Sequence, residues 1–424
     1  MKNIIQSVKG TREFYPHEMA VRRWLYALIE ETSKSFGYQE YDGPFIEKID
    51  LYAAKSGEEL VKEQSFVFPD RGGDLVTLRP ELTLSLARMI AQKQNELAYP
   101  VRWWSFGPFW RYEKPQKGRT REFFQWNIDM IGVDSPVADA ELLAICATFL
   151  KNAGLRPDQV KILVNHRQLM EQKLLEFGIA DELKKNVFQL IDRKDKLDSK
   201  AWEDYAMEIG LSKDQFSGIQ TILSDNELWK QSAELSKVFE LLDVLGVKEF
   251  IKYDPKIIRG LDYYTGIVFE AWDMGRDGRA VLGGGHYANL VADVGGNPLP
   301  GVGFAMGDVM ATILLQKYGC IPETKPFKDT VLVTIFDENG IQQSTKLAAF
   351  LRQAGIRTIV YPESAKLQKQ FKFADRIGVS AVVVIGPDES AQGMVTIKNL
   401  IDHTQVTCPQ EMAVQTIKEF MNLK

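Results

Sequence analysis

Hydrophobic and polar positions alternate over two runs in the first third of the chain, on either side of a polar loop. The first run ends at Arg111 and Glu113, and the second covers residues 123–131. Alternation with a period of two predicts β-strands, and Pro115 and Gly118 between the runs predict a loop. The segment 109–132 should therefore form the end of a strand, a loop and a return strand.

The remainder of residues 1–318 alternates long helical patterns with aromatic, strand-like runs. Within it, residues 166–250 are helical in pattern and rich in Lys, Glu and Leu, which predicts an inserted helical subdomain. Residues 320–328 hold two prolines and few large apolar residues. They predict a linker between a first domain, residues 1–319, and a second, residues 329–424.

Strand and helix patterns alternate after the linker. Strands are predicted at 331–336, 356–361, 381–385 and 394–397, and helices at 341–354, 365–377 and 409–421. This order predicts a small α/β domain with a largely parallel sheet. The helix at 365–377 carries Lys366, Lys369, Lys372 and Arg376 away from its apolar face. Such a basic face is either solvated or binds a phosphate backbone.

Composition narrows the class of protein. With 424 residues the chain should form two or three domains, and its net charge of −5 excludes a strong overall attraction to nucleic acid. We expect no signal peptide and no membrane span. The three cysteines are far apart and odd in number, which suggests reduced thiols in the cytoplasm. The four histidines are scattered, so no metal cluster is expected and the metal ligands stay unknown.

The loop after Glu113 is basic. It carries Lys114, Lys117, Arg119 and Arg121. A guanidinium group binds phosphate oxygens through two hydrogen bonds, so this loop suits a polyphosphate, although a solvated hairpin is the alternative. The chain contains no P-loop, and the glycines at 301–307 lack the spacing of a dinucleotide fold. If ATP binds, arginines and a sheet must hold it.

Three further segments carry candidate chemistry. In 76–83 (VTLRPELT), Glu81 is either part of a helix start with Pro80 in its first turn or an acceptor for a substrate ammonium group. In 259–266 (RGLDYYTG), a glycine-flanked Arg259 suits a preorganised cation at a pocket wall. In 282–290 (LGGGHYANL), the glycines permit either close approach to a ligand or a tight turn, and His286 alone is more often structural.

Taken together, these segments resemble the histidyl-tRNA synthetase family of class II aminoacyl-tRNA synthetases, over nearly the full chain. Residues 9–16 (KGTREFYP) are similar to its N-terminal motif, and 36–47 (FGYQEYDGPFIE) to motif 1, with Pro44 at the dimer-interface position. The loop region 111–132 resembles motif 2, and 259–266 resembles the histidine-specific motif. Residues 366–374 and 394–400 resemble the anticodon-binding domain.

The resemblance implies an α+β fold, in which a class II catalytic domain built on an antiparallel sheet carries a helical insertion and is followed by an α/β anticodon-binding domain. It implies ATP-dependent ligation of histidine to its tRNA through a histidyl-adenylate. The implied partners are histidine, ATP with Mg²⁺, tRNA(His) and a second copy of the chain in a homodimer, with no membrane.

The resemblance also implies roles for individual residues. Arg111 would bridge the substrate carboxylate and the ATP α-phosphate, and Arg259 would place a second cation there. ATP would further contact Glu113, near the adenine, and Arg121. The residues implied for histidine are Glu81, Thr83, Gln125, Asp129, Tyr263, Tyr264 and Tyr287. Those implied for tRNA are Lys366, Lys369 and Lys372.

The chain departs from the family pattern at three positions. Met310 stands where motif 3 usually has an arginine against the adenine, His286 replaces a common arginine, and Asp129 replaces a more common glutamate. Either this lineage holds ATP otherwise, with Arg119, Arg121, Arg276 and Arg279 as available substitutes, or adenylation has been lost. The alternatives to an active ligase are a paralogue such as the histidine-binding regulatory subunit of ATP phosphoribosyltransferase, or a non-catalytic tRNA-binding module.

Overall fold

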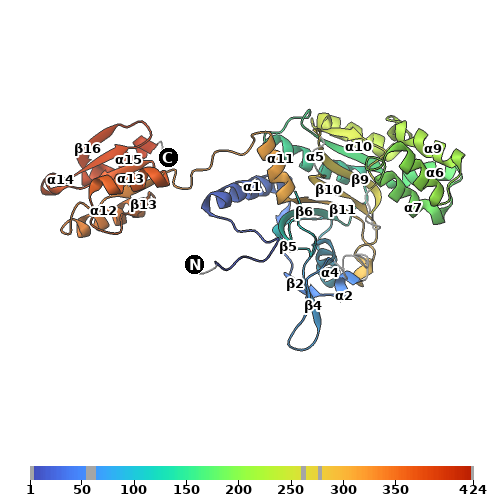
Figure 1. Ribbon diagram of the computed structural model, residues 1–424, viewed down its shortest axis with the longest axis horizontal. Coiled ribbons are helices and arrows are strands. Elements are labelled where there is room, and N and C mark those ends of the chain that lie inside the picture. The colour runs from blue at the N-terminus through green and yellow to red at the C-terminus, as the bar shows by residue number, and fades with distance from the viewer. Residues whose placement is uncertain (1–3, 54–63, 259–263, 276–278, 422–424) are drawn as a thin grey trace. The chain divides into compact units, whose positions relative to one another are not determined.

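The computed structural model describes residues 4–53, 64–258, 264–275 and 279–421 (Figure 1). The chain divides into two compact units, one made of residues 1–13 and 22–322 and the other of residues 14–21 and 323–424. The domain limits expected from the sequence stay a prediction. Arg259, Tyr263 and Arg276 lie outside the described residues.

An eight-stranded sheet is the frame of the first unit. Its strands, in spatial order, are β1 (Gln39–Glu40), β5 (Val101–Trp110), β6 (Glu122–Ile131), β11 (Gly301–Gly307), β10 (Leu282–Tyr287), β9 (Tyr264–Asp273), β7 (Val160–His166) and β8 (Ile251–Tyr253). Every pairing from β5 to β7 is antiparallel, and β1 and β8 join the two edges in parallel. The predicted α+β fold with an antiparallel catalytic sheet is confirmed.

Helices pack on both faces of this sheet (Figure 1). On one face, α5 (Pro136–Asn152), α10 (Ala233–Val244) and α11 (Asp308–Lys317) share a hydrophobic core with Trp126, Ile128 and Met130 of β6. On the other face, α4 (Thr83–Lys93) packs against Tyr264 and Tyr287. Because strand side chains alternate, Gln125 and Asp129 point to the α4 face. That face therefore carries the candidate site.

Short elements lie before α4. These are α1 (Pro16–Ser35), β2 (Ile46–Lys48), α2 (Asp50–Ala53), β3 (Val67–Pro69) and β4 (Leu75–Leu78). The strands β2, β3 and β4 form a small antiparallel sheet in the order β2-β4-β3. The helix expected near Pro80 begins at Thr83, so Pro80 precedes the helix and does not occupy its first turn. The expectation of Pro80 in the first turn was wrong, because Glu81 and the N-cap residue Leu82 lie between Pro80 and the helix.

Helices fill the chain between β7 and β8. They are α6 (Arg167–Glu176), α7 (Asp181–Asp192), α8 (Ser199–Glu208), α9 (Lys213–Ser224), η1 (Leu228–Gln231), α10 and η2 (Lys248–Phe250). Side chains of His166, Asp198, Ser212 and Ser232 accept hydrogen bonds from backbone N–H groups in the first turns of α6, α8, α9 and α10. Such caps satisfy N–H groups that have no partner inside the helix, which explains where these helices begin.

The second unit holds a five-stranded sheet in the order β13 (Arg357–Val360), β12 (Thr330–Val333), β14 (Ala381–Val384), β15 (Met394–Asn399) and β16 (Gln405–Pro409). Its helical segments are α12 (Ile341–Gln353), α13 (Leu367–Ile377), α14 (Pro387–Gln392), η4 (Gln410–Met412) and α15 (Ala413–Met421).

The expectation of a largely parallel sheet in the second unit holds for only half of it. β12 pairs in parallel with β13 and β14, but β14–β15 and β15–β16 are antiparallel. Strand β16 was not predicted, because it is short and only Cys408 within it is buried. The turn before it contains His403 in the left-handed region, at φ 62°, which allows β15 and β16 to pair as a hairpin.

Candidate active site

Two glycines of β11 make room for the centre of the site. A Cβ atom at Gly303 would lie 2.0 Å from Asp129 Oδ1, and one at Gly301 would lie 2.7 Å from Cε2 of Tyr287. Any side chain at these positions would displace both residues, since Cβ atoms do not approach other heavy atoms so closely. The glycines of β11 thus leave the space that the side chains of Asp129 and Tyr287 occupy.

Asp129 is the buried acid of the site. Its side chain accepts a hydrogen bond of 2.9 Å from Tyr287 Oη and is 6 % exposed. Burial raises the pKa of Asp129 to about 7, and the tyrosine hydrogen bond opposes part of that rise. Burial raises the pKa of the neighbouring Tyr41, and the charge of Asp129 raises it further. A carboxyl group in this environment is stabilised as an anion when a cation binds beside it.

The tyrosines come from neighbouring strands. Tyr287 on β10 pairs in register with Tyr264 on β9, and the missing side chain of Gly285 leaves space for the Tyr264 ring. Asp129, Tyr264 and Tyr287 therefore lie together, as a histidine pocket would need. Gln125 lies on the same face of β6, four residues before Asp129, in register with Gly107 and Gly307.

Arg111 lies beside the segment that contains Glu81. Its Nε donates to the Pro80 carbonyl oxygen at 3.0 Å, and its guanidinium lies 5.3 Å from the Phe123 ring centroid. Thr83 is the first residue of α4, and the Tyr52 hydroxyl donates to the Glu81 carbonyl oxygen at 3.4 Å. The end of β5 and the N-terminal end of α4 therefore meet at the candidate site.

Arg79 fixes the same region and was not among the predicted site residues. It is fully buried and donates to Asp42 Oδ1 at 2.5 Å, and to the carbonyl oxygens of Gly43 and Pro108 at 3.0 and 2.9 Å. Gly107 leaves room for this guanidinium, because a Cβ there would lie 2.4 Å from Arg79 Nη2. Arg79 connects the segment of Pro44 to β5. Its burial was not expected from the sequence, because arginine side chains are rarely fully buried.

The motif 2 loop is folded on itself. Arg119 Nη1 pairs with Glu113 Oε2 at 2.6 Å, and Arg121 Nε donates to the Glu113 carbonyl oxygen at 3.2 Å. The Arg121 guanidinium also lies 4.0 Å from the Tyr112 ring centroid. Gln116 and Arg119 exchange backbone hydrogen bonds of 2.8 and 3.1 Å, which makes Lys117 and Gly118 the tip of a hairpin.

Met310 on α11 contacts this hairpin tip. A Cβ atom at Gly118 would lie 2.4 Å from Met310 Sδ. Met310 also lines a cavity of about 210 Å³ together with Lys117, Asp273, Val281, Ile313, Leu314 and Lys317. The thioether therefore packs against the loop at the position where the family usually has an arginine.

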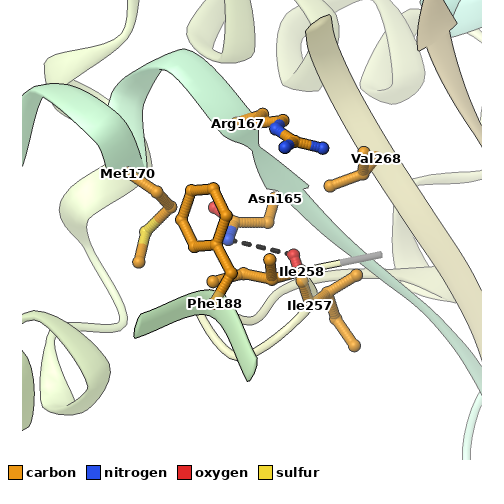
Figure 2. A pocket seen from close by; sticks show the side chains of 7 residues that line it. All are labelled: Asn165, Arg167, Met170, Phe188, Ile257, Ile258 and Val268. Atoms are coloured by element: carbon orange, nitrogen blue, oxygen red, sulfur yellow. Dashed lines mark hydrogen bonds between the residues drawn. The ribbon is translucent and has the colours of Figure 1, made fainter. Parts of the chain in front are cut away.

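The chain before Arg259 is held in place by Asn165 of β7. Its Nδ2 donates to the carbonyl oxygens of Pro255 and Ile257, both at 3.1 Å. Figure 2 shows Asn165 beside a small pocket that it lines with Ile257, Ile258, Val268 and residues of the helical segment. The histidine-specific motif thus begins directly after a fixed, buried segment.

The three lysines predicted to bind tRNA lie along α13 in the second unit. All three are exposed, but Lys369 Nζ is paired with Glu363 Oε1 at 2.6 Å. Lys366 occupies the N-cap position, and Lys372 lies one turn after Lys369. The exposed face is therefore basic but partly neutralised.

A family model described as histidyl-tRNA synthetase matches residues 10–308, and a second, described as an anticodon binding domain, matches residues 330–420. The chain is 36 % identical over 415 residues to a histidine–tRNA ligase of Halobacterium salinarum, with 95 % of each chain covered. It is 35 % identical to a chloroplastic and mitochondrial histidine–tRNA ligase of Arabidopsis thaliana, over 92 % of this chain and 82 % of the plant protein.

The chain belongs to the histidyl-tRNA synthetase family. A crystal structure of histidyl-tRNA synthetase from a Nostoc species has the same fold, with a TM-score of 0.84 at 24 % identity over 99 % of this chain and 100 % of that one. The resemblance inferred from the motifs is confirmed. As an aminoacyl-tRNA synthetase, the protein is an enzyme that uses ATP as a substrate.

Two absences hold for the described residues. None of their helices combines the length and apolar character needed to cross a membrane. They also contain no group of three or more His, Cys, Asp or Glu side chains arranged to bind a metal ion.

Proposed function

We propose that this synthetase joins histidine to tRNA(His) in two steps. The carboxylate of histidine attacks the α-phosphorus of ATP, which forms histidyl-adenylate and releases pyrophosphate. A terminal ribose hydroxyl of the tRNA then attacks the activated carbonyl carbon, which releases AMP. Such a reaction needs positioning and charge stabilisation more than covalent side-chain chemistry. The buried Asp129–Tyr287 pair is the observation that carries the choice of histidine, because it offers an acid to a cationic or hydrogen-bonding substrate.

The side chains at the site support distinct roles. Asp129, Gln125 and Tyr264 share one sheet face and would bind the histidine side chain and ammonium group, with Glu81 and Thr83 approaching from the start of α4. A polar pocket of this kind discriminates against apolar amino acids, because its buried groups would lose their partners. Arg111, at the end of β5, would bind the carboxylate and the α-phosphate.

The motif 2 loop would bind ATP. Arg119 and Arg121 are bonded to Glu113 in this structure. When a triphosphate binds, these guanidinium groups would leave Glu113 and bind phosphate oxygens. Mg²⁺ would neutralise phosphate charge in this reaction. Magnesium commonly binds through substrate phosphates and one or two carboxylates.

The proposal includes a homodimer. Exposed apolar side chains gather on the small sheet after Pro44: Phe45, Ile46, Val67, Phe68 and Leu75 are between 39 % and 53 % exposed. Apolar side chains gathered on a surface in this way mark interaction sites. Sedimentation velocity should give a dimer, and a monomer at micromolar concentration would contradict this part. We place the dimer in the cytoplasm, in keeping with three cysteines that form no disulfide.

Histidine-dependent exchange of pyrophosphate into ATP tests the proposal directly. The second candidate is a histidine-binding regulatory protein, and a structure titled as an ATP phosphoribosyltransferase regulatory subunit/histidyl-tRNA synthetase from Bacillus halodurans shares the fold, with a TM-score of 0.73 at 21 % identity. The fold therefore does not separate the two. Arg111, Glu113 and the complete second unit favour the ligase, whereas histidine binding without any exchange would favour the regulatory protein.

Replacing Asp129 with asparagine should weaken histidine binding about 10- to 100-fold, because a charge-assisted hydrogen bond to the substrate is lost. The pKa of Asp129 is raised to about 7, so its anion is lost as the pH falls through that value. The ratio of wild-type to Asp129→Asn affinity for histidine should therefore decrease between pH 8 and pH 6. Calorimetry on both proteins measures this, and Asp129→Asn provides the baseline for titration of the substrate itself. Equal affinities at pH 8 would contradict the assignment.

The contacts of Met310 and Arg121 predict unequal effects on ATP. Arg121→Ala should raise the KM for ATP about tenfold or more, because a cation that can reach phosphate is removed. Met310→Ala should change it less than about threefold, since the thioether contacts the loop tip and carries no charge. Steady-state exchange kinetics on the two variants decide between them, and the reverse order would refute the proposed role of Arg121.

A further inference from the structure

A buried histidine lies behind the candidate pocket. His286 precedes Tyr287 on β10, so the two side chains point to opposite faces of the sheet. Tyr287 reaches Asp129 on the α4 face, whereas His286 reaches Asp139 of α5 on the other. His286 is 4 % exposed, which removes it from solvent and from direct contact with a substrate in the pocket.

Both ring nitrogens of His286 face a carboxylate. Nδ1 lies 3.2 Å from Asp139 Oδ1, and Nε2 lies 3.5 Å from Asp134 Oδ1. The Nδ1–Asp139 contact is a hydrogen bond, and the Nε2–Asp134 contact is an ion pair. A neutral imidazole carries one N–H group and can present it to only one of these acids, whereas an imidazolium presents one to each. The geometry therefore fits the charged ring.

The surrounding charges act in the same direction. Burial alone would lower the pKa of His286, but the hydrogen bond and charge of Asp139, with the charges of Asp134 and Glu234, raise it above its usual value. Glu234 on α10 is itself paired with His166 Nε2 at 2.8 Å. Among the described residues, the charged groups that act on His286 are Asp139 of α5, Asp134 in the segment before it and Glu234 of α10.

His286 also touches the histidine-specific motif. A Cβ atom at Gly266, the last residue of that motif, would lie 3.2 Å from His286 Cβ and 3.4 Å from its Cγ. The strand pairing between β9 and β10 shifts register between Gly285 and Tyr287, directly at this contact. The ring therefore supports an irregular point in the sheet where two parts of the candidate pocket meet.

We propose that His286 is a positioning residue for the histidine pocket: its imidazolium, held between Asp139 and Asp134, fixes the strand segment that carries Tyr287 and supports Gly266. The inference rests on the proposed function, in which Tyr287 and the 259–266 motif form that pocket. The imidazolium stabilises this strand segment fully below the usual histidine pKa, and the stabilisation is lost as the pH rises through the raised pKa of His286. Loss of the charge would release the strand and weaken histidine binding.

His286→Arg should keep the ion pairs that support the strand and should remove their pH dependence. Asp139 Oδ2 is buried and accepts no hydrogen bond from the described residues. A guanidinium has paired donors that can serve both oxygens of one carboxylate, and it stays charged at all relevant pH values. His286→Arg is therefore the charge-preserving variant, and His286→Gln is the neutral one.

The test is histidine-dependent pyrophosphate exchange from pH 6 to pH 9, with KM for histidine and for ATP measured separately. For His286→Gln we expect a KM for histidine raised about tenfold at pH 6.5, with KM for ATP unchanged. The wild-type KM should approach that of the glutamine variant at high pH, and His286→Arg should stay low throughout. Because histidine titrates too, the ratio of wild type to His286→Arg isolates the enzyme group. A folded glutamine variant with wild-type KM at every pH would overturn the proposal.

His166→Gln is the matched control. It removes the other buried histidine–carboxylate pair and the cap of α6, so it should lower the melting temperature without changing the pH dependence of KM for histidine. A KM profile that shifts as strongly for His166→Gln as for His286→Gln would mean general destabilisation and would overturn the specific role.

The charge state of His286 can be measured even if a variant does not fold. NMR titration of ring-labelled wild-type protein, with resonances assigned by substitution, should give His286 a pKa above its usual value that decreases in Asp139→Asn. A His286 ring that is neutral at pH 6 would overturn the inference whatever the activity. Absence of any histidine-dependent exchange in the wild type would instead remove the proposed function, while the NMR titration would still report on the ring.

Discussion

Arg259→His is expected to lower kcat for histidine-dependent pyrophosphate exchange by about 10²- to 10³-fold, with a much smaller change in KM for histidine. Charge accumulates on the α-phosphate as the carboxylate attacks, and a cation placed there in advance stabilises the transition state more than the bound substrate. Arg259 itself lies outside the described residues. The segment before it is fixed by the two hydrogen bonds of Asn165, which suits a preorganised side chain.

Arg193→His provides the matched control for this variant. Arg193 is the C-cap residue of α7, and its guanidinium lies 4.7 Å from the Tyr205 ring centroid. It belongs to the helical segment and not to the strand face that carries Asp129. The same change of residue type there should leave exchange within about threefold of wild type, because no charge is removed from the reacting atoms. Near wild-type exchange by Arg259→His, with the protein folded, would refute the role of Arg259.

Deletion of residues 327–424 is expected to spare histidine activation but to reduce aminoacylation of tRNA(His) about 10²-fold or more. The deleted segment has its own sheet and its own buried cores and contains no strand of the sheet that carries β6 and β10. Its match to an anticodon binding domain motivates the loss in tRNA charging. The measurement is kcat/KM for tRNA beside the exchange rate of the same protein, and full charging by the shortened chain would refute an anticodon role.

Lys369→Glu and Lys372→Glu should reproduce a smaller, salt-sensitive part of that loss, since each removes one cation that can face a phosphate. Lys372→Glu should have the larger effect, because Lys369 is already paired with Glu363. Lys346→Glu on α12 is the matched control, as it changes the same charge at another exposed position. An equal loss in all three variants would indicate a net-charge effect and not contact by α13.

The motifs identified the family by resemblance, and the resemblance implied the antiparallel catalytic sheet. The alternation of side chains predicted the face of β6 that carries Gln125 and Asp129, because a period of two fixes which residues of one strand share a face. The alternation also predicted strand β6 nearly to its ends and the loop between β5 and β6. Strand β16 was not predicted, because its five residues alternate weakly and its pairing depends on a turn.

Only the tertiary structure decided which strands are neighbours. The order β6-β11-β10 brings Asp129 to the hydroxyl of Tyr287 although 158 positions separate them in the chain, and Gly303 makes the approach possible. The same pairing turns His286 away from the pocket, towards Asp139, and the loop fold places Gly118 on Met310. A sequence pattern determines faces within an element, whereas contacts between distant elements depend on packing and hydrogen bonding that form only when the whole chain folds.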